Sequence, residues 1–161
     1  MAYKSILTIL TNLANAESTI HAAARLARSQ DAHLDVLVLG VDRTQVGYSY
    51  IGSGAVLMQV GIDRAEQDAR ALQKAADAAL AKEFSDLRSS VEAIVTQLGA
   101  LTDLVASRAR FADLVVLAKP YGSGGGAESE AVIEAALFDG KAPVLVLPAK
   151  GLGEHAIPRR I

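Results

Sequence analysis

The sequence predicts an α/β protein built on a five-stranded parallel sheet, and three observations support this. Short apolar runs alternate with amphipathic segments, which is the order that places helices on both faces of a parallel sheet. The 161 residues suit one domain. The apolar share of 51% is enough to cover a buried sheet on both sides. We therefore expect a doubly wound sheet with strand order 3-2-1-4-5.

The strands are predicted from apolar runs that end at polar, glycine or proline residues. They are expected at residues 5–10, 34–39, 91–96, 113–117 and 143–148. The alternation of apolar and polar residues in the third run indicates an edge strand. Pro143 and Pro148 bracket the fifth run.

Four helices are expected between these strands, the second of them with the clearest three- and four-residue spacing of apolar positions. They are expected at residues 15–29 or 18–29, 62–80, about 101–105, and 131–138. Residues 11–16 are polar and are expected to form a turn. Residues 41–61 contain glycines and have no helical or strand period, so we expect a long, mobile loop there.

Composition excludes several classes of function. The formal net charge of −2 offers no broad basic surface for nucleic acid. Cysteine is absent, which removes disulfides and thiol catalysis and fits a reducing cytoplasm. The opening MAYKSILTIL does not have the pattern of a signal peptide, and no segment has the roughly 20 apolar residues of a membrane span. We expect a cytoplasmic protein with neither nucleic-acid nor membrane partners.

A glycine-rich stretch, AKPYGSGGGAES at residues 118–129, lies between the fourth strand and the last helix. In the predicted strand order, ligands bind beyond the carboxyl ends of the first and fourth strands, where the order reverses. Thr11 and Asn12 follow the first strand, and residues 118–126 follow the fourth. Backbone N–H groups of a glycine-rich turn at such a place can hold a phosphate.

Several segments together resemble the universal stress protein family over residues 3–148. They are YKSILTIL, LDVLVLGVD, the long charged second helix, ADLVVLAKP and APVLVLP. The resemblance implies a flavodoxin-like, or adenine nucleotide alpha hydrolase-like, three-layer α/β/α sandwich as a domain of residues 1–148. Residues 149–161 are expected to be a tail or a linker, and their PRRI resembles the opening YKSI, so a second copy in tandem and an ordinary C-terminus both stay open.

The resemblance also identifies positions that hold a nucleotide in binding members of the family. Those members carry an aspartate after the first strand and a valine after the second. After the fourth strand they have G-x-x-G and, further on, G-[ST]. Here Thr11 stands at the aspartate position, Val41 matches the valine, and Ala118 stands at the first glycine. The distal motif falls near Glu128 and Glu130, whose carboxylates would repel a phosphate.

These departures predict a non-enzymatic stress-response or interaction protein with a degenerate nucleotide site and no cofactor. The candidate residues of that site are Thr11, Asn12, Val41, Ala118, Lys119, Gly122, Ser123, Gly124 and Gly125. The alternative is an ATP- or AMP-binding member with a signalling role or slow hydrolysis. In that case the glycine run, with Lys119 and Ser123, would cup a phosphate.

Other ligands have weaker support. The polar stretch after the first strand resembles a flavodoxin phosphate loop but has no glycine, and the chain has no tryptophan to stack on a flavin. His21, His33 and His155 do not converge in the predicted topology, so no metal site is expected. Asp42 could bind a ribose hydroxyl but is better explained as a turn residue. A small-molecule or lipid site with residues 41–61 as a lid has only that segment's apolar residues in its favour.

The fifth strand predicts self-association. In the order 3-2-1-4-5, Val144–Leu147 lies at the sheet edge with an unpaired row of backbone groups, and its apolar side chains are expected to be covered on both faces. The flanking prolines would limit the pairing to a closed two-fold contact. Dimers in the family resemble this, so we expect a homodimer, or a tandem pseudo-dimer, through Val144–Leu147.

Overall fold

The computed structural model describes residues 3–44, 54–122 and 126–148, and its elements alternate as the sequence predicts. They are β1 (Ser5–Leu10), α1 (Leu13–Gln30), β2 (His33–Asp42), α2 (Gly54–Glu83), β3 (Ser89–Gln97), the 3-10 helix η1 (Leu98–Ala100), α3 (Leu101–Ala109), β4 (Leu114–Ala118), α4 (Ala127–Glu134), the π-helical turn η2 (Ala135–Asp139) and β5 (Val144–Leu147). The strands are all parallel, in the order β3-β2-β1-β4-β5. The predicted fold class is therefore confirmed, including the edge position of β3.

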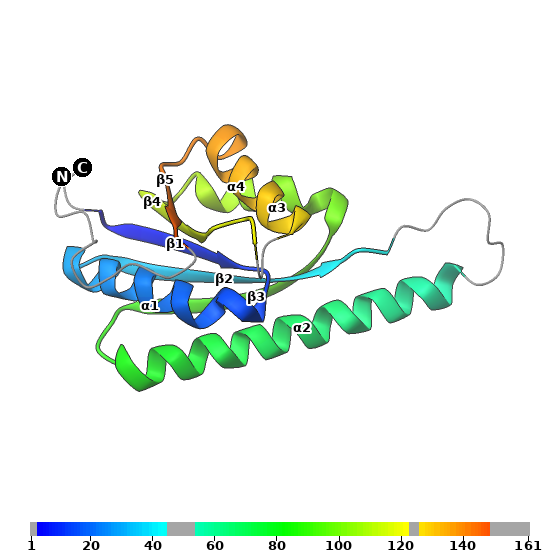
Figure 1. Cartoon of the computed structure of the whole chain (residues 1–161), viewed down its shortest axis with the longest axis horizontal. Helices are drawn as coiled ribbons and strands as arrows, with labels where there is room; N and C mark the ends of the chain where they lie inside the picture. The colour runs from blue at the N-terminus through cyan, green and yellow to red at the C-terminus, as the bar shows by residue number, and fades with distance from the viewer. Residues whose placement is uncertain (1–2, 45–53, 123–125, 149–161) are drawn as a thin grey trace.

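The sheet separates two helical layers, with α1 and α2 on one face and α3 and α4 on the other (Figure 1). Successive residues of β2 alternate between these layers, so that Val36 and Val38 pack toward α1 and α2 while Leu37 packs toward α3 and α4. Both faces of the central strands are buried, which explains their nearly continuous apolar sequences. Among the described residues, no helix is both long and apolar enough to span a bilayer.

The prediction of a long loop at residues 41–61 is wrong at both ends of that range. Strand β2 continues through Val41 and Asp42, and α2 begins at Gly54. The first turns of α2 carry exposed apolar side chains at Val56 and Val60, so no amphipathic period marks the start of the helix. Residues 45–53 lie outside the described residues, and the mobility predicted for them stays a prediction.

The glycines on either side of that segment allow β2 and α2 to approach closely. A Cβ atom added at Gly40 would lie 2.1 Å from the carbonyl oxygen of Ala65. One added at Gly61 would lie 2.0 Å from Thr44 Oγ1 and 2.4 Å from Asp42 Oδ1. These glycines are therefore needed for packing between a strand and a helix, and not for the freedom of a loop.

Two predicted helix starts are also wrong. Helix α1 begins at Leu13, and Asn12 caps it by accepting a hydrogen bond of 2.7 Å from the backbone N–H of Ala14, so the turn expected at residues 11–16 does not form. Helix α4 begins at Ala127, four residues before the predicted start. Its first turn is acidic and lacks an apolar period, and the helix dipole favours carboxylates at that end.

Candidate functional site

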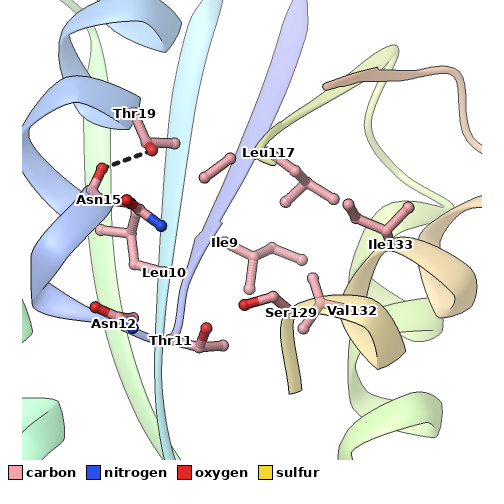
Figure 2. Close-up of a pocket in the computed structure, with 11 residues that line it drawn as sticks. Ile9, Leu10, Thr11, Asn12, Asn15, Thr19, Leu117, Ser129, Val132 and Ile133 are labelled. Carbon is pink, nitrogen blue, oxygen red and sulfur yellow. Dashed lines mark hydrogen bonds between the residues drawn. The ribbon is translucent and has the colours of Figure 1, made fainter. Parts of the chain in front are cut away.

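A small cavity opens at the carboxyl ends of β1 and β4, where the strand order reverses. Thr11 and Asn12 come from the end of β1, Ala118 from the end of β4, and Ser129 and Val132 from the first turns of α4 (Figure 2). The cavity volume is about 30 Å³. Pockets for drug-sized ligands, which are comparable in size to a nucleotide, enclose roughly 300–1,000 Å³, so the cavity bounded by the described residues is too small to hold a nucleotide without rearrangement.

The other candidate residues lie around this cavity or apart from it. Val41 is buried toward α3 and α4, and it also borders a separate hollow of about 310 Å³ beside α2. Lys119 is exposed. Gly122 has a φ of 96°, in the left-handed region that favours glycine. The remaining candidates, Ser123, Gly124 and Gly125, lie outside the described residues.

Asn12 and Asp42 both have structural roles. Asn12 caps α1, as described above. Asp42 is buried at the end of β2, where its Oδ1 accepts a hydrogen bond of 2.9 Å from the backbone N–H of Thr44. Hydrogen bonds from Thr44 lower the pKa of Asp42, which keeps the carboxylate ionised within its own turn. This geometry agrees with the interpretation of Asp42 as a turn residue.

A bidentate ion pair near the cavity joins Arg43 to Glu128, and sequence reasoning missed it. The Nε and Nη2 atoms of Arg43 donate to Oε1 and Oε2 of Glu128, with an Nη2–Oε2 distance of 2.8 Å. The hydrogen bond to Glu128 raises the pKa of Arg43. Only 14% of the Glu128 side chain is exposed, against 59% of Arg43, so in this bidentate pair it is the carboxylate that is partly desolvated.

This ion pair crosses the end of the first strand. Arg43 directly follows β2, and Glu128 lies in the first turn of α4, beyond β4. Since β1 lies between β2 and β4 in the sheet, the pair spans the region beyond the carboxyl ends of β1 and β4. We call this region, which includes the small cavity, the crevice. The sequence signal for this ion pair was a basic residue, Arg43, directly after β2. Its partner Glu128 is 85 positions away, so the sequence alone did not connect the two.

Two histidine side chains each lie beside a carboxylate. His21 Nδ1 lies 3.3 Å from Glu83 Oε2, and His33 Nε2 lies 3.2 Å from Asp35 Oδ1. Across residues 3–44, 54–122 and 126–148, no group of three or more histidine and carboxylate side chains is arranged to hold a metal ion. His155 lies outside these ranges.

Comparison with known proteins identifies the fold. No family model matches the sequence, and no curated protein matches it. Among solved structures, a universal stress protein family member from Burkholderia pseudomallei is 21% identical, with a TM-score of 0.60 over 91% of this chain and 97% of the other. UspA from Lactobacillus plantarum is 17% identical, also with a TM-score of 0.60, over 92% and 99%. The chain has the universal stress protein fold.

A third universal stress protein structure adds a ligand to the comparison. The family member from Arabidopsis thaliana was solved with AMP bound, and it is 9% identical to this chain, with a TM-score of 0.52 over 95% of this chain and 97% of the other. Identities this low establish the shared fold. The universal stress protein fold confirms the resemblance first detected in the strand sequences.

Proposed function

We propose that this chain is a non-enzymatic, cytoplasmic stress-response and interaction domain whose nucleotide site is degenerate. The observation that carries the proposal is the Arg43–Glu128 ion pair across the crevice. The Glu128 carboxylate stands in the first turn of α4, where a helix N-terminus would otherwise stabilise a phosphate. The protein thus supplies its own anion at that position.

A nucleotide would meet three obstacles at the crevice. Its phosphates would lie beside the mostly buried carboxylate of Glu128, and like charges repel strongly where water is partly excluded. If Arg43 turned to bind the phosphate, Glu128 would lose its bidentate partner, and an unpaired, partly desolvated carboxylate is costly. The third obstacle is the cavity volume of about 30 Å³.

The direct test is to look for a bound nucleotide. Protein purified without added nucleotide is denatured, and the released small molecules are identified by mass spectrometry; a thermal-shift screen with ATP, ADP and AMP follows. We expect no nucleotide near one equivalent, no rise in melting temperature and no ATP turnover. Release of AMP or ATP at close to one equivalent would contradict the proposal.

Two matched variants test the role assigned to Glu128. Glu128 and Glu130 lie in the same turn of α4, and replacing either with serine removes one negative charge. Of these two glutamates, Glu128 is the one that accepts hydrogen bonds from Arg43. We expect E128S to bind ATP measurably more tightly than the unmodified chain and E130S to behave like the unmodified chain. Equal behaviour of the two variants would show that the ion pair does not block the crevice.

The alternative function is binding of ATP or AMP for signalling. It is supported by Val41, which keeps the residue type of binding members, and by AMP in the Arabidopsis structure of the same fold. In this case Arg43 would leave Glu128 and bind the phosphates. Saturable chemical-shift changes at Val41 and Thr11 on addition of AMP would favour this function over the degenerate site.

Self-association through β5 is part of the main proposal. The backbone N–H of Val115 donates to the carbonyl of Pro143, so the alternation along β5 turns the N–H and C=O groups of Val144 and Val146 away from β4. Val146 is 42% exposed, and Val144 and Leu145 are half-buried. The expected covering of both faces is therefore wrong for this strand, and the incomplete covering leaves apolar surface for a second copy.

A further inference from the structure

A second, larger cavity lies near the amino-terminal ends of β1, β2 and β3, at the opposite end of the strands from the crevice. Its volume is about 210 Å³, and it is lined by these strand starts and by residues at and just after the end of α3. It shares no lining residue with the cavity at the carboxyl ends of β1 and β4. A ligand bound here would therefore occupy a site separate from the one proposed at the crevice.

The apolar lining of this cavity has a buried part, which forms its floor, and an exposed aromatic side chain at its rim. Leu7 of β1 and Leu37 of β2 form the floor and are buried. Phe111, just after α3, lines the cavity and is 85% exposed, which is unusual for a large aromatic side chain. An apolar molecule in the cavity could therefore contact the leucines on one side and the Phe111 ring on another.

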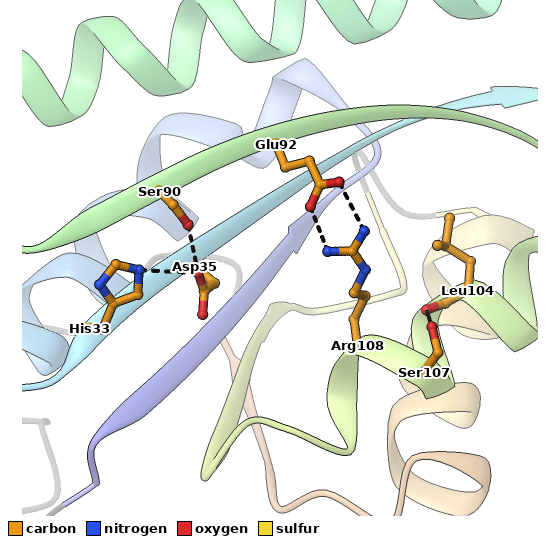
Figure 3. Close-up of polar contacts among 7 residues, drawn as sticks. All are labelled: His33, Asp35, Ser90, Glu92, Leu104, Ser107 and Arg108. Carbon is orange, nitrogen blue, oxygen red and sulfur yellow. Dashed lines mark hydrogen bonds and ion pairs between the residues drawn. The ribbon is translucent and has the colours of Figure 1, made fainter.

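The polar part consists of two groups of contacts, one between side chains of β2 and β3 and one between Glu92 of β3 and Arg108 of α3 (Figure 3). Ser90 Oγ donates to Asp35 Oδ1 at 2.6 Å, and His33 Nε2 lies 3.2 Å from the same oxygen. Arg108 donates to both oxygens of Glu92, at 2.5 and 2.9 Å.

The charges in this cavity are not balanced. Asp35 and Glu92 are negative, Arg108 is positive, and the hydrogen bond to Glu92 raises the pKa of Arg108. With histidine counted as neutral, one negative charge remains. Within the described part of the chain, both contacts of Asp35 use Oδ1, so Oδ2 can accept a further hydrogen bond.

We propose that this cavity binds a small organic cation, a protonated amine with an apolar body. The ammonium group donates to Asp35 Oδ2, and the unbalanced carboxylate makes this hydrogen bond a charge-assisted one. The apolar body packs on Leu7 and Leu37. The Phe111 ring closes over it, and its negative π face attracts a nearby cation. The same charge disfavours carboxylates and phosphates.

Three probes of similar shape test the charge preference. Phenethylamine is cationic, phenethyl alcohol is neutral and hydrocinnamate is anionic at neutral pH. Each is titrated into the 161-residue chain, with affinity followed by the amide shifts of Leu7 and Ser90. We expect saturable binding of the amine alone. No binding of the amine at millimolar concentration, or equal binding of the alcohol, would overturn the proposal.

Matched variants then test the assigned contact. Asp35→Asn keeps the size and the Ser90 contact but removes the charge, and it should weaken amine binding at least about tenfold, since a hydrogen bond to a charged group contributes that much or more. Asp103→Asn removes the same charge from an exposed position on α3 and should leave affinity unchanged. Phe111→Ala, at an exposed position, should also weaken binding. Unchanged affinity in both D35N and F111A would overturn the assignment.

Discussion

Replacing Gly40 with alanine should strain the packing of α2 against β2. The added Cβ would lie 2.1 Å from the carbonyl oxygen and 2.8 Å from the carbonyl carbon of Ala65, whereas ordinary contact begins at 3.4 Å. These are helix backbone atoms, which cannot rotate away as a side chain can. The oxygen contact is more than 1 Å too short, and the third neighbour, Ala69 Cβ, is tight at 3.0 Å. The helix must therefore shift as a unit.

The expected loss is at the upper end of the range for overpacked cores, about 3 kcal/mol. For a domain of this size that corresponds to a melting temperature lower by about 6–12 °C. Urea unfolding followed by far-UV circular dichroism measures the free energy of unfolding directly.

Gly99 provides the matched control, because a Cβ there meets nothing within 4 Å. Gly99→Ala should change the unfolding free energy by less than about 0.5 kcal/mol, or stabilise slightly by restricting the unfolded chain. If Gly40→Ala also stayed within about 0.5 kcal/mol of the unmodified chain, the close approach of α2 to β2 would be refuted.

Three further predictions concern a helix cap, a carboxylate and the sheet edge. Asn12→Ala removes the acceptor of the Ala14 N–H and should lower the unfolding free energy by about 1 kcal/mol in urea denaturation. Asp113 accepts hydrogen bonds of 2.7 and 3.0 Å from two backbone N–H groups beside β1, and these lower its pKa below 3.8. Its contribution to stability is therefore complete above pH 3.8 and is lost as the pH falls through the lower folded pKa, so Asp113→Asn should flatten the pH dependence of unfolding in that acidic range. Val146→Pro removes an outward-facing N–H and should convert the dimer expected from β5 into a monomer in light scattering.

Each of these predictions can be contradicted by a specific result. Asn12→Asp keeps an acceptor and should stay close to the unmodified chain, and a loss as large as that of Asn12→Ala would contradict the capping role. Equal acid sensitivity of Asp113→Asn and the unmodified chain would show that Asp113 contributes no such stabilisation. A monomeric unmodified chain at high concentration, or a dimeric Val146→Pro variant, would refute the β5 interface.

The central strands of the sheet could be predicted because they are buried on both faces. Ser5–Leu10 was predicted to the residue, since a fully buried parallel strand is a continuous apolar run with polar neighbours. The start of α2 could not be predicted, because Val56, Leu57 and Val60 are exposed and a helical period appears only where one face is buried. The same reasoning explains the early start of α4.

The position of the crevice followed from topology, but its chemistry did not. Thr11 and Ala118 were placed at the strand ends by the rule that ligands bind where the strand order reverses, and both line the cavity there. The Arg43–Glu128 pair depends on two side chains that extend toward each other across a third strand. Sequence spacing contains no information on that geometry.

The central claim is that the crevice at the ends of β1 and β4 does not bind nucleotide tightly. Isothermal titration of the unmodified chain with ATP tests it most directly. The Arg43–Glu128 pair and the 30 Å³ cavity predict no binding tighter than about 10 μM, which corresponds to about −7 kcal/mol. A dissociation constant at or below about 10 μM, with one ATP per chain, would contradict the account.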